Sequence, residues 1–243
     1  MFDKYTLKAR IAPAVINCLP LIILLTVLVK QLNLDLKSII GFTVLSTVAI
    51  PYFLSEIIRN GGKKLEVINY QKWGGIPTTI LLRQSDTEYD VITINRIYDF
   101  ISSDFEIDLR TDNSDGNITN AVKHIISMFH RQKDDLLLTH NIDYGFARNL
   151  AGGSTLLFIQ LAVGTLIAIV NAYFHRSTDN GYWTIGVLVA LGIAVVLRSK
   201  VYPYMVRDRA FRYATTLIDL YYYHKTNQVR PSTTVSNTNS MQN

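Results

Sequence analysis

The segment Tyr144–Phe174, YGFARNLAGGSTLLFIQLAVGTLIAIVNAYF, decides the fold of this 243-residue chain. From Asn149 to Phe174, 26 consecutive positions carry no Asp, Glu, Lys, Arg or His side chain. A helix rises about 1.5 Å per residue, so this stretch is about 39 Å long and exceeds the roughly 30 Å of bilayer hydrocarbon. Helices of soluble proteins turn one face to water and seldom stay uncharged for so long. The segment therefore predicts a transmembrane helix, with the polar residues up to Asn149 at the boundary between membrane and cytosol.

The composition of the whole chain agrees with a membrane protein. Hydrophobic residues make up 49% of the chain and charged residues 18%, whereas ordinary soluble domains carry about 25% charged residues. Much of the net charge of +5 lies beside the apolar segments, which favours a role in membrane topology, and no nucleic-acid partner is expected. Cys18 is the only cysteine, so the chain can form neither an internal disulfide nor a cysteine zinc site.

Three further apolar segments are predicted to cross the membrane. Ile11–Val29 follows a basic N-terminus, and the alternative of a secretory signal peptide is disfavoured by its length and by the lack of a small-residue cleavage pattern. Ser38–Ser55 comes after the short loop Lys30–Lys37, and Asn180–Leu197 follows the segment described first. The sequence therefore predicts an all-α membrane protein with four transmembrane helices in two hairpins.

Local features of the first hairpin are expected to shape it. Pro13 and Pro20 each lack a backbone donor and should kink the first helix. Glu56 and Arg59 lie three residues apart just beyond the second apolar segment, a spacing that allows an ion pair on one helical face. The alternative is that Glu56 is a buried carboxylate with a functional role in the membrane.

The polar segment between the second and third spans is predicted to be a small helical domain. Asn60–Trp73 continues the second span as a helix, and Gly74–Gly75 ends that helix. Pro77 suits the first position of a new short helix, Pro77–Arg83. Further helices are predicted over Thr93–Ser102, after a cap at Thr119, and over Asp134–Asn149.

The distribution of basic residues predicts the orientation in the membrane. Lys and Arg beside spans are retained in the cytoplasm, and the two hairpin loops hold only Lys30, Lys37 and Arg176. Both termini and the polar insert are therefore expected in the cytoplasm. The expected domains are a cytoplasmic N-terminus (1–10), a first transmembrane hairpin (11–58), a cytoplasmic helical domain (59–150), a second transmembrane hairpin (151–198), a cytoplasmic basic and aromatic helix (199–225) and a disordered tail (226–243).

One corner of the insert carries the residues best suited to bind a ligand. Gly74 and Gly75 permit backbone conformations closed to other residues, and Pro77 fixes the path of the chain beyond them. The amides and hydroxyls of Thr78 and Thr79 then lie at a helix N-terminus, which attracts anions. The candidate ligand-binding residues are Lys63, Lys64, Trp73, Gly74, Gly75, Thr78, Thr79, Arg83, Arg148 and Asn149. The alternative is a helical corner with Trp73 in the core and no ligand.

These residues resemble an uncharacterised family of bacterial inner-membrane proteins with the pattern KKxE…WGGxPTTxxLR…YGFxRNL. The matching positions are Lys63, Lys64, Glu66, Trp73, Gly74, Gly75, Pro77, Thr78, Thr79, Leu82 and Arg83, then Tyr144, Gly145, Phe146, Arg148, Asn149 and Leu150. The chain departs from the family at Arg83–Asp86, where a more basic stretch is expected, and in the short linker Asp104–Asn117. The resemblance implies a four-span architecture in a bacterial inner (plasma) membrane, and it implies no reaction. Because both ends of the pattern adjoin spans, they are expected to fold against each other at the membrane surface.

The sequence carries no GxxxxGK[ST], GxSxG, HExxH or GxGxxG motif, so no catalytic residue, metal or cofactor is expected. The leading hypothesis is a non-enzymatic protein whose cytoplasmic domain senses a ligand or partner and biases the packing of the spans, as a pore-type or stress and defence effector would. One alternative is a membrane-bound enzyme acting on lipid or nucleotide through Asp86, Glu88 or His140, and another is a scaffold that tethers a protein complex. The expected partners are membrane lipid, further copies of the chain, and a cytoplasmic protein or an anionic small molecule.

Overall fold

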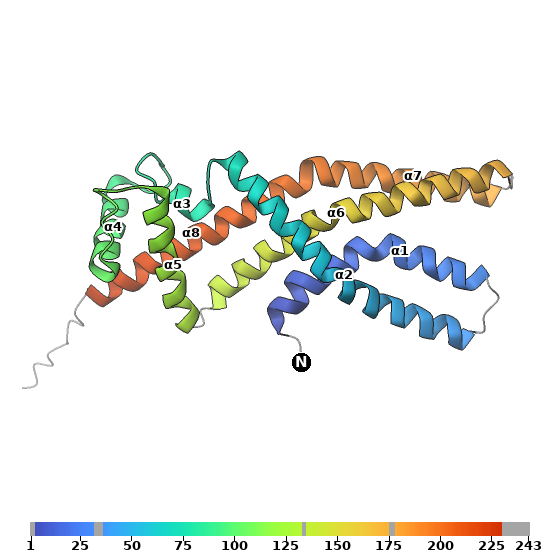
Figure 1. Ribbon diagram of the computed structural model, residues 1–243, viewed down its shortest axis with the longest axis horizontal. Helices are drawn as coiled ribbons and strands as arrows, with labels where there is room; N and C mark the ends of the chain where they lie inside the picture. Colours follow the sequence, from blue (N-terminus) through green and yellow to red (C-terminus); the bar gives the residue numbers. More distant parts are fainter. Residues whose placement is uncertain (1–2, 32–35, 133–134, 175–177, 230–243) are drawn as a thin grey trace, which may run out of the picture. The chain divides into compact units, whose positions relative to one another are not determined.

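The computed structural model describes residues 3–31, 36–132, 135–174 and 178–229, and its regular structure is helical throughout these ranges (Figure 1). The α-helices are α1 (Ala12–Gln31), α2 (Leu36–Trp73), α3 (Pro77–Leu81), α4 (Val91–Phe105), α5 (Asp115–Gln132), α6 (Asp135–Phe174), α7 (Thr178–Val196) and α8 (Tyr202–Val229). Short π-helical stretches, Thr6–Ile11 and Leu197–Val201, lead into α1 and α8. The predicted all-α class is confirmed for the described residues.

Among the described residues, three helical segments are long and apolar enough to cross a membrane: Thr6–Leu24, Asp135–Phe174 and Gly181–Gln228. They include most or all of the predicted first, third and fourth spans. The predicted second span, Ser38–Ser55, forms the first half of α2, and several of its side chains fall outside the described part of the chain, so its membrane crossing stays a prediction. Of the predicted hairpin loops, residues 32–35 and 175–177 lie outside the described residues, whereas residues 30–31, 36–37 and 178–179 are helical and the loops are shorter than expected.

Contacts divide the chain into two compact units, which do not coincide with the expected domains. The first unit comprises Met1–Pro77 and Lys133–Tyr213, and the second comprises Thr78–Gln132 and Ala214–Asn243. Both ends of the expected domain 59–150 therefore belong with the apolar helices. The physical reason is that Leu65 and Trp73, near the end of α2, pack against the same buried residues as the first half of α8.

In the first unit, α6 is the helix on which the others pack. It contacts α1, α2 and α7, and Figure 1 shows α6 and α7 side by side. One buried cluster contains Ala14, Cys18, Ile22 and Ile58, with Leu156 of α6 against it. A second contains Tyr144, Ala147, Leu150, Ala151, Tyr202, Val206 and Ala210. Burial of these apolar side chains fixes which face of α6 meets each neighbour.

The two prolines of the first helix have consequences in the fold. Pro13 has no N–H to give to the carbonyl of Ala9, four residues earlier, and the π-helical stretch Thr6–Ile11 lies directly before it. The Ala9 carbonyl accepts a hydrogen bond from Asn149 Nδ2 at 2.6 Å. Beside Pro20, the amide of Leu21 donates to Gln160 Oε1 at 3.1 Å. Side chains of α6 thus form hydrogen bonds with backbone groups of α1 and of the π-helical stretch before it, as an apolar environment requires.

The second unit has its own small core. Ile97, Tyr98 and Ile101 of α4 are buried on one face, as their spacing predicts. Phe105 stacks with His124 at 5.1 Å between ring centroids and with Tyr221 of α8 at 6.2 Å. Further buried residues of this unit are Leu81, Leu82, Leu109, Ile118, Ala121, Val122, Ile125, Phe129, Ala214, Leu217 and Ile218.

Polar side chains complete the packing of α8 in the second unit. Asp104 accepts hydrogen bonds from the Tyr221 hydroxyl at 2.9 Å and from Lys225 Nζ at 2.6 Å. The Tyr89 hydroxyl donates to Asp219 at 2.9 Å. These bonds fix one face of α8 against the helices that precede it in this unit.

Glycine and proline predicted the end of α2 and the start of α3 correctly. Gly75 N donates to the Tyr70 carbonyl at 2.8 Å and closes α2, with Gly74 at φ 86°, and Pro77 begins α3 as predicted. The prediction that Thr119 caps α5 was wrong, because the helix already begins at Asp115. A carboxylate in the first turn interacts favourably with the helix dipole, which suits this earlier start.

The C-terminal end of α8 also differs from its expected boundary. The helix runs to Val229, so residues 226–229 of the expected disordered tail are helical. The remainder of that tail, 230–243, lies outside the described residues.

Helix α4 should lose its N-cap in acid. Asp90 accepts hydrogen bonds from the amides of Ile92 and Thr93 and from the Thr93 hydroxyl. These bonds, the Thr93 hydroxyl foremost, hold the pKa of Asp90 below its ordinary value of 3.8. A depressed pKa in the folded state means that the cap contributes fully above pH 3.8 and is lost as the pH falls through the lower folded value.

Hydrogen exchange of the Ile92 and Thr93 amides, measured on either side of pH 3.8, tests this expectation. Protection should fall in acid in the wild type, whereas Asp90→Asn, which keeps an acceptor but cannot titrate, should show no such step. An identical acid step in Asp90→Asn would assign the loss to another group.

Candidate functional site

The candidate ligand-binding residues fall into both compact units. Those in the first unit are Lys63, Lys64, Trp73, Gly74, Gly75, Arg148 and Asn149, and those in the second are Thr78, Thr79 and Arg83. Each group is therefore described within its own unit.

The three candidates of the second unit have partners within that unit. Thr78 and Thr79 are buried, and the Thr79 hydroxyl lies 3.4 Å from the Thr119 hydroxyl. Arg83 donates to both carboxylate oxygens of Asp115, at 2.9 and 2.7 Å. This hydrogen-bonded ion pair raises the pKa of Arg83 and lowers that of Asp115. Helix α3 runs from Pro77 to Leu81 and is two residues shorter than predicted, and the anion site expected at its N-terminus stays a prediction.

Among the candidates of the first unit, Trp73 packs into a core. Its ring lies 6.0 Å from that of Tyr70 and 5.9 Å from that of Phe211, measured between centroids. This environment favours the alternative in which Trp73 has a structural role. Lys63 and Lys64 are exposed.

Arg148 belongs to a polar cluster that joins α2 to α6. We call Glu66, Tyr70, Tyr144 and Arg148 the Glu66 cluster. The Glu66 carboxylate accepts hydrogen bonds from the Tyr144 hydroxyl at 2.5 Å and the Tyr70 hydroxyl at 2.9 Å. Arg148 Nη1 lies 3.3 Å from both carboxylate oxygens. Two ends of the family pattern, KKxE and YGFxRNL, thus meet in this cluster, as their position beside the spans led us to expect.

The Glu66 cluster is largely withdrawn from solvent. The side chains of Arg148 and Glu66 are 13% and 19% exposed, and the Arg148 guanidinium lies 5.7 Å from the centroid of the Tyr144 ring. Burial, more than the nearby carboxylate, raises the pKa of Tyr70, so its phenol stays protonated and donates. Because its members are bonded to one another, the cluster is suited to hold two helices together rather than to transfer protons to a substrate.

Next to this cluster, α2 and α6 cross at glycines. We call Gly61, Gly62, Gly152 and Gly153 the glycine crossing. A Cβ atom on Gly152 would lie 2.2 Å from the backbone nitrogen of Gly62, and one on Gly61 would lie 2.8 Å from the Gly152 carbonyl oxygen. No side chain fits at such distances, so the two backbones touch.

Two asparagines join α1 and the π-helical stretch before it to α6, beside the glycine crossing. Asn149 donates to the Ala9 carbonyl, and Asn17 Nδ2 donates to the Leu150 carbonyl at 3.2 Å. Asn17 also fills the space beside Gly153, where an added Cβ would lie 2.4 Å from its Nδ2. Helices α1, α2 and α6 are therefore joined at the N-terminal end of the uncharged part of α6.

Sequence reasoning missed several residues of this junction. Glu66 and Tyr144 were recognised only as part of the family pattern, whereas Asn17, Tyr70 and the Gly61–Gly62 pair were not singled out as candidates. A usable signal was present, because a glycine pair inside a helix and an asparagine inside an apolar span both weaken those elements unless a close neighbour compensates.

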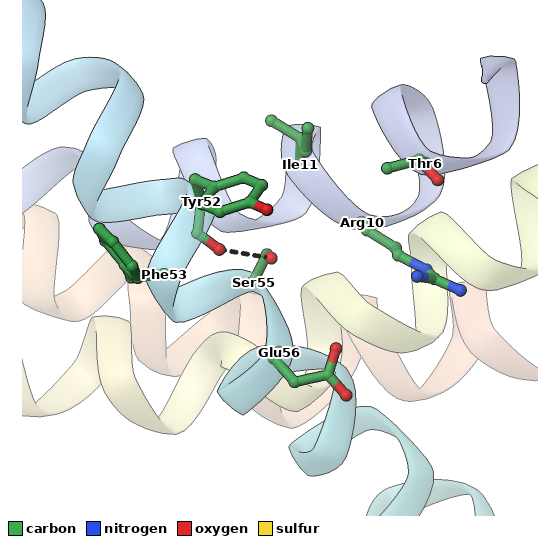
Figure 2. A pocket seen from close by; sticks show the side chains of 7 residues that line it. All are labelled: Thr6, Arg10, Ile11, Tyr52, Phe53, Ser55 and Glu56. Carbon is green, nitrogen blue, oxygen red and sulfur yellow. Dashed lines mark hydrogen bonds between the residues drawn. The ribbon is translucent and has the colours of Figure 1, made fainter. Parts of the chain in front are cut away.

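The first unit also contains a pocket of about 400 Å³, shown in Figure 2. It is lined by Thr6, Arg10, Ile11, Tyr52, Phe53, Ser55 and Glu56. Arg59 Nη1 donates to the two carboxylate oxygens of Glu56 at 2.9 and 3.2 Å, which confirms the predicted pair. The Ser55 hydroxyl donates to the Tyr52 carbonyl at 2.7 Å.

Over the ranges that the structure describes, no group of three or more His, Cys, Asp or Glu residues is placed to hold a metal ion. Comparison of the chain with protein-family models, curated proteins and solved structures gives no match. The resemblance to the four-span bacterial family thus stays a prediction from the residues themselves.

Proposed function

We propose that this chain is a bacterial inner-membrane protein in which a cytoplasmic helical unit senses a ligand or partner and controls the packing of four transmembrane helices. The observation that carries the proposal is the junction formed by the Glu66 cluster and the glycine crossing. It joins residues 61–70 of α2 to residues 144–153 of α6, where the polar part of α6 passes into its uncharged segment.

The exposed surface of α2 supports a membrane crossing by the predicted second span, Ser38–Ser55. Ile40, Val44 and Val48 follow one another at four-residue spacing and are 54%, 59% and 67% exposed. Soluble monomers rarely expose so continuous an apolar stripe. In a bilayer the same stripe faces lipid at no cost, and the helix satisfies its own backbone groups.

The junction supports a coupling role because it leaves little freedom between α2 and α6. Backbones in direct contact at the glycine crossing cannot slide without a clash, and closely packed interiors transmit strain. A change in the helices between Thr78 and Gln132 reaches the apolar segments along α2 and α6. Helix α8 offers a third route, since its residues belong to both units.

The pore-type form of the proposal predicts that expression of the wild-type chain depolarises the bacterial inner membrane. Arg148→Gln, which breaks the Glu66 cluster, should abolish depolarisation while the chain still inserts. Lys72→Gln removes a positive charge from an exposed position of α2 that is not among the candidate ligand-binding residues, and it serves as the matched control, with depolarisation retained. A potential-sensitive dye gives the readout, and a stable potential in cells that contain inserted wild-type protein would contradict the effector.

Membrane insertion and orientation are checked in the same strains. Single cysteines at Asp112 and Tyr182, in a Cys18→Ala background, are labelled with a membrane-impermeant maleimide. Tyr182→Cys should react in intact spheroplasts and Asp112→Cys only after lysis. Reaction of Asp112→Cys from outside would reverse the proposed topology.

A further inference from the structure

The pocket of Figure 2 lies where the headgroups of a bilayer would be. Arg10 is the last charged residue before the first apolar segment, and Glu56 is the first after the second. Both line the pocket. Under the proposed membrane insertion, on which this inference rests, charged residues at span ends lie at the interface.

The pocket offers an unsatisfied cationic donor. Arg10 Nε is buried and has no hydrogen-bond acceptor among the described residues, while its guanidinium lies 5.7 Å from the centroid of the Tyr5 ring. A guanidinium forms charge-assisted, often bidentate hydrogen bonds with phosphate oxygens, as it does with carboxylates. Glu56 is paired with Arg59, whereas Arg10 makes no salt bridge among the described residues and its charge acts at longer range on the exposed Asp3.

The remaining polar atoms indicate the kind of headgroup. The Ser55 hydroxyl gives its hydrogen to the Tyr52 carbonyl, so its oxygen can serve the pocket as an acceptor, as can the Glu56 carboxylate. Acceptors beside a phosphate site suit the hydroxyls of a glycerol headgroup. A choline cation has no N–H or O–H to donate to them, and an ethanolamine cation would compete with Arg59 for Glu56.

The apolar side of the pocket suits acyl chains. In Figure 2 the charged ends of Arg10 and Glu56 lie toward one end of the view, and Tyr52 and Phe53 lie toward the other. Tyr52 and Phe53 are 52% and 74% exposed. Their side chains therefore offer apolar surface beside the polar end, as a lipid with both a headgroup and chains requires.

We propose that this pocket binds a monoanionic phospholipid with a glycerol headgroup, whose phosphate is held by Arg10. Ser55 and Glu56 accept hydrogen bonds from the headgroup hydroxyls, and the acyl chains lie along Tyr52 and Phe53.

Native mass spectrometry of the full-length chain in a neutral detergent tests the proposal with added phosphatidylglycerol, phosphatidylcholine or glycerol 3-phosphate. Phosphatidylglycerol should bind roughly tenfold more tightly than phosphatidylcholine, and glycerol 3-phosphate should not compete with it. Arg10→Gln should weaken phosphatidylglycerol binding about tenfold, the scale of one charge-assisted hydrogen bond. Lys8→Gln, an exposed position of the same π-helical stretch, should change binding less than about twofold.

Three results would overturn the proposal: equal binding of the two lipids, equal effects of Arg10→Gln and Lys8→Gln, or full competition by glycerol 3-phosphate, which would make the pocket a site for soluble anions. The comparison of the two lipids uses the wild-type chain, so it tests the proposal even if the Arg10→Gln variant does not fold. Lipid preference is measured without a membrane potential, so its failure is distinguishable from failure of the proposed effector function.

Discussion

Replacement of Gly152 by valine is expected to separate α2 from α6 and to produce the largest loss of stability of any single change proposed for this chain. A Cβ at this position would lie 2.2 Å from the nitrogen and 2.5 Å from the Cα of Gly62. Both of these are backbone atoms, which cannot rotate away as a side chain can. Overpacking a well-packed core costs about 1–3 kcal/mol, and a backbone clash lies at or above the upper end of this range.

A loss of about 3 kcal/mol corresponds to a fall of roughly 6–12 °C in Tm for a chain of this size. The measurement is thermal unfolding of the purified protein in detergent. Gly164→Ala, in the same helix, is the matched control, because its Cβ would lie 3.8 Å from a Val187 methyl group at ordinary van der Waals distance. Equal melting of the Gly152→Val variant and the wild type would show that the two helices do not cross at these glycines.

Arg148→Gln is expected to lower the free energy of unfolding less than Gly152→Val does. Its effect falls on one identified charge, the Glu66 carboxylate. In Arg148→Gln the Glu66 carboxylate keeps the two tyrosine hydroxyls and loses its cationic partner within the cluster. Breaking a buried ion pair by deleting one partner costs about 3–5 kcal/mol. Because both side chains retain some exposure, about 2–3 kcal/mol is expected here.

A double-mutant cycle separates the pair from the rest of the cluster. Glu66→Gln combined with Arg148→Gln should lose less stability than the two single changes together, with a coupling of about 1–2 kcal/mol. Asp99→Asn, which breaks the exposed pair between Asp99 and Arg110, is the control and should change Tm little. Additive losses in the cycle would mean that Glu66 and Arg148 do not interact in solution.

The candidate site was predictable only where it depended on neighbours along the chain. The pair of Glu56 with Arg59 follows from a three-residue spacing on one helix. The end of α2 at Gly74 and the start of α3 at Pro77 follow from the backbone freedom of glycine and the fixed φ of proline. Whether an anion could reach Thr78 and Thr79 depends on how the short helix that contains them packs. The sequence could not show that these two threonines would be buried.

The Glu66 cluster could not be predicted from the sequence. Glu66 and Arg148 are 82 residues apart, and each lies on a long helix whose rotation about its axis decides which neighbour it meets. The family pattern brought these residues to attention, but it did not state that two tyrosine hydroxyls complete the carboxylate's hydrogen bonds. The same holds for Asn149, whose partner is the carbonyl of Ala9, four residues before Pro13 and 140 residues away in the sequence.

By itself, the sequence determined that this chain is helical and that it carries segments able to cross a membrane, because length without charge and local turn chemistry are properties of neighbouring residues. Only the tertiary structure decided that Gly61 and Gly62 meet Gly152, that Asn17 lies beside Gly153, and that the ends of the insert pack with the apolar helices. Those contacts depend on the faces and crossing points of helices far apart in the chain, and many pairings satisfy the same hydrophobic pattern. Close packing selects among them, since only the pairing that places glycine opposite glycine lets the two backbones touch.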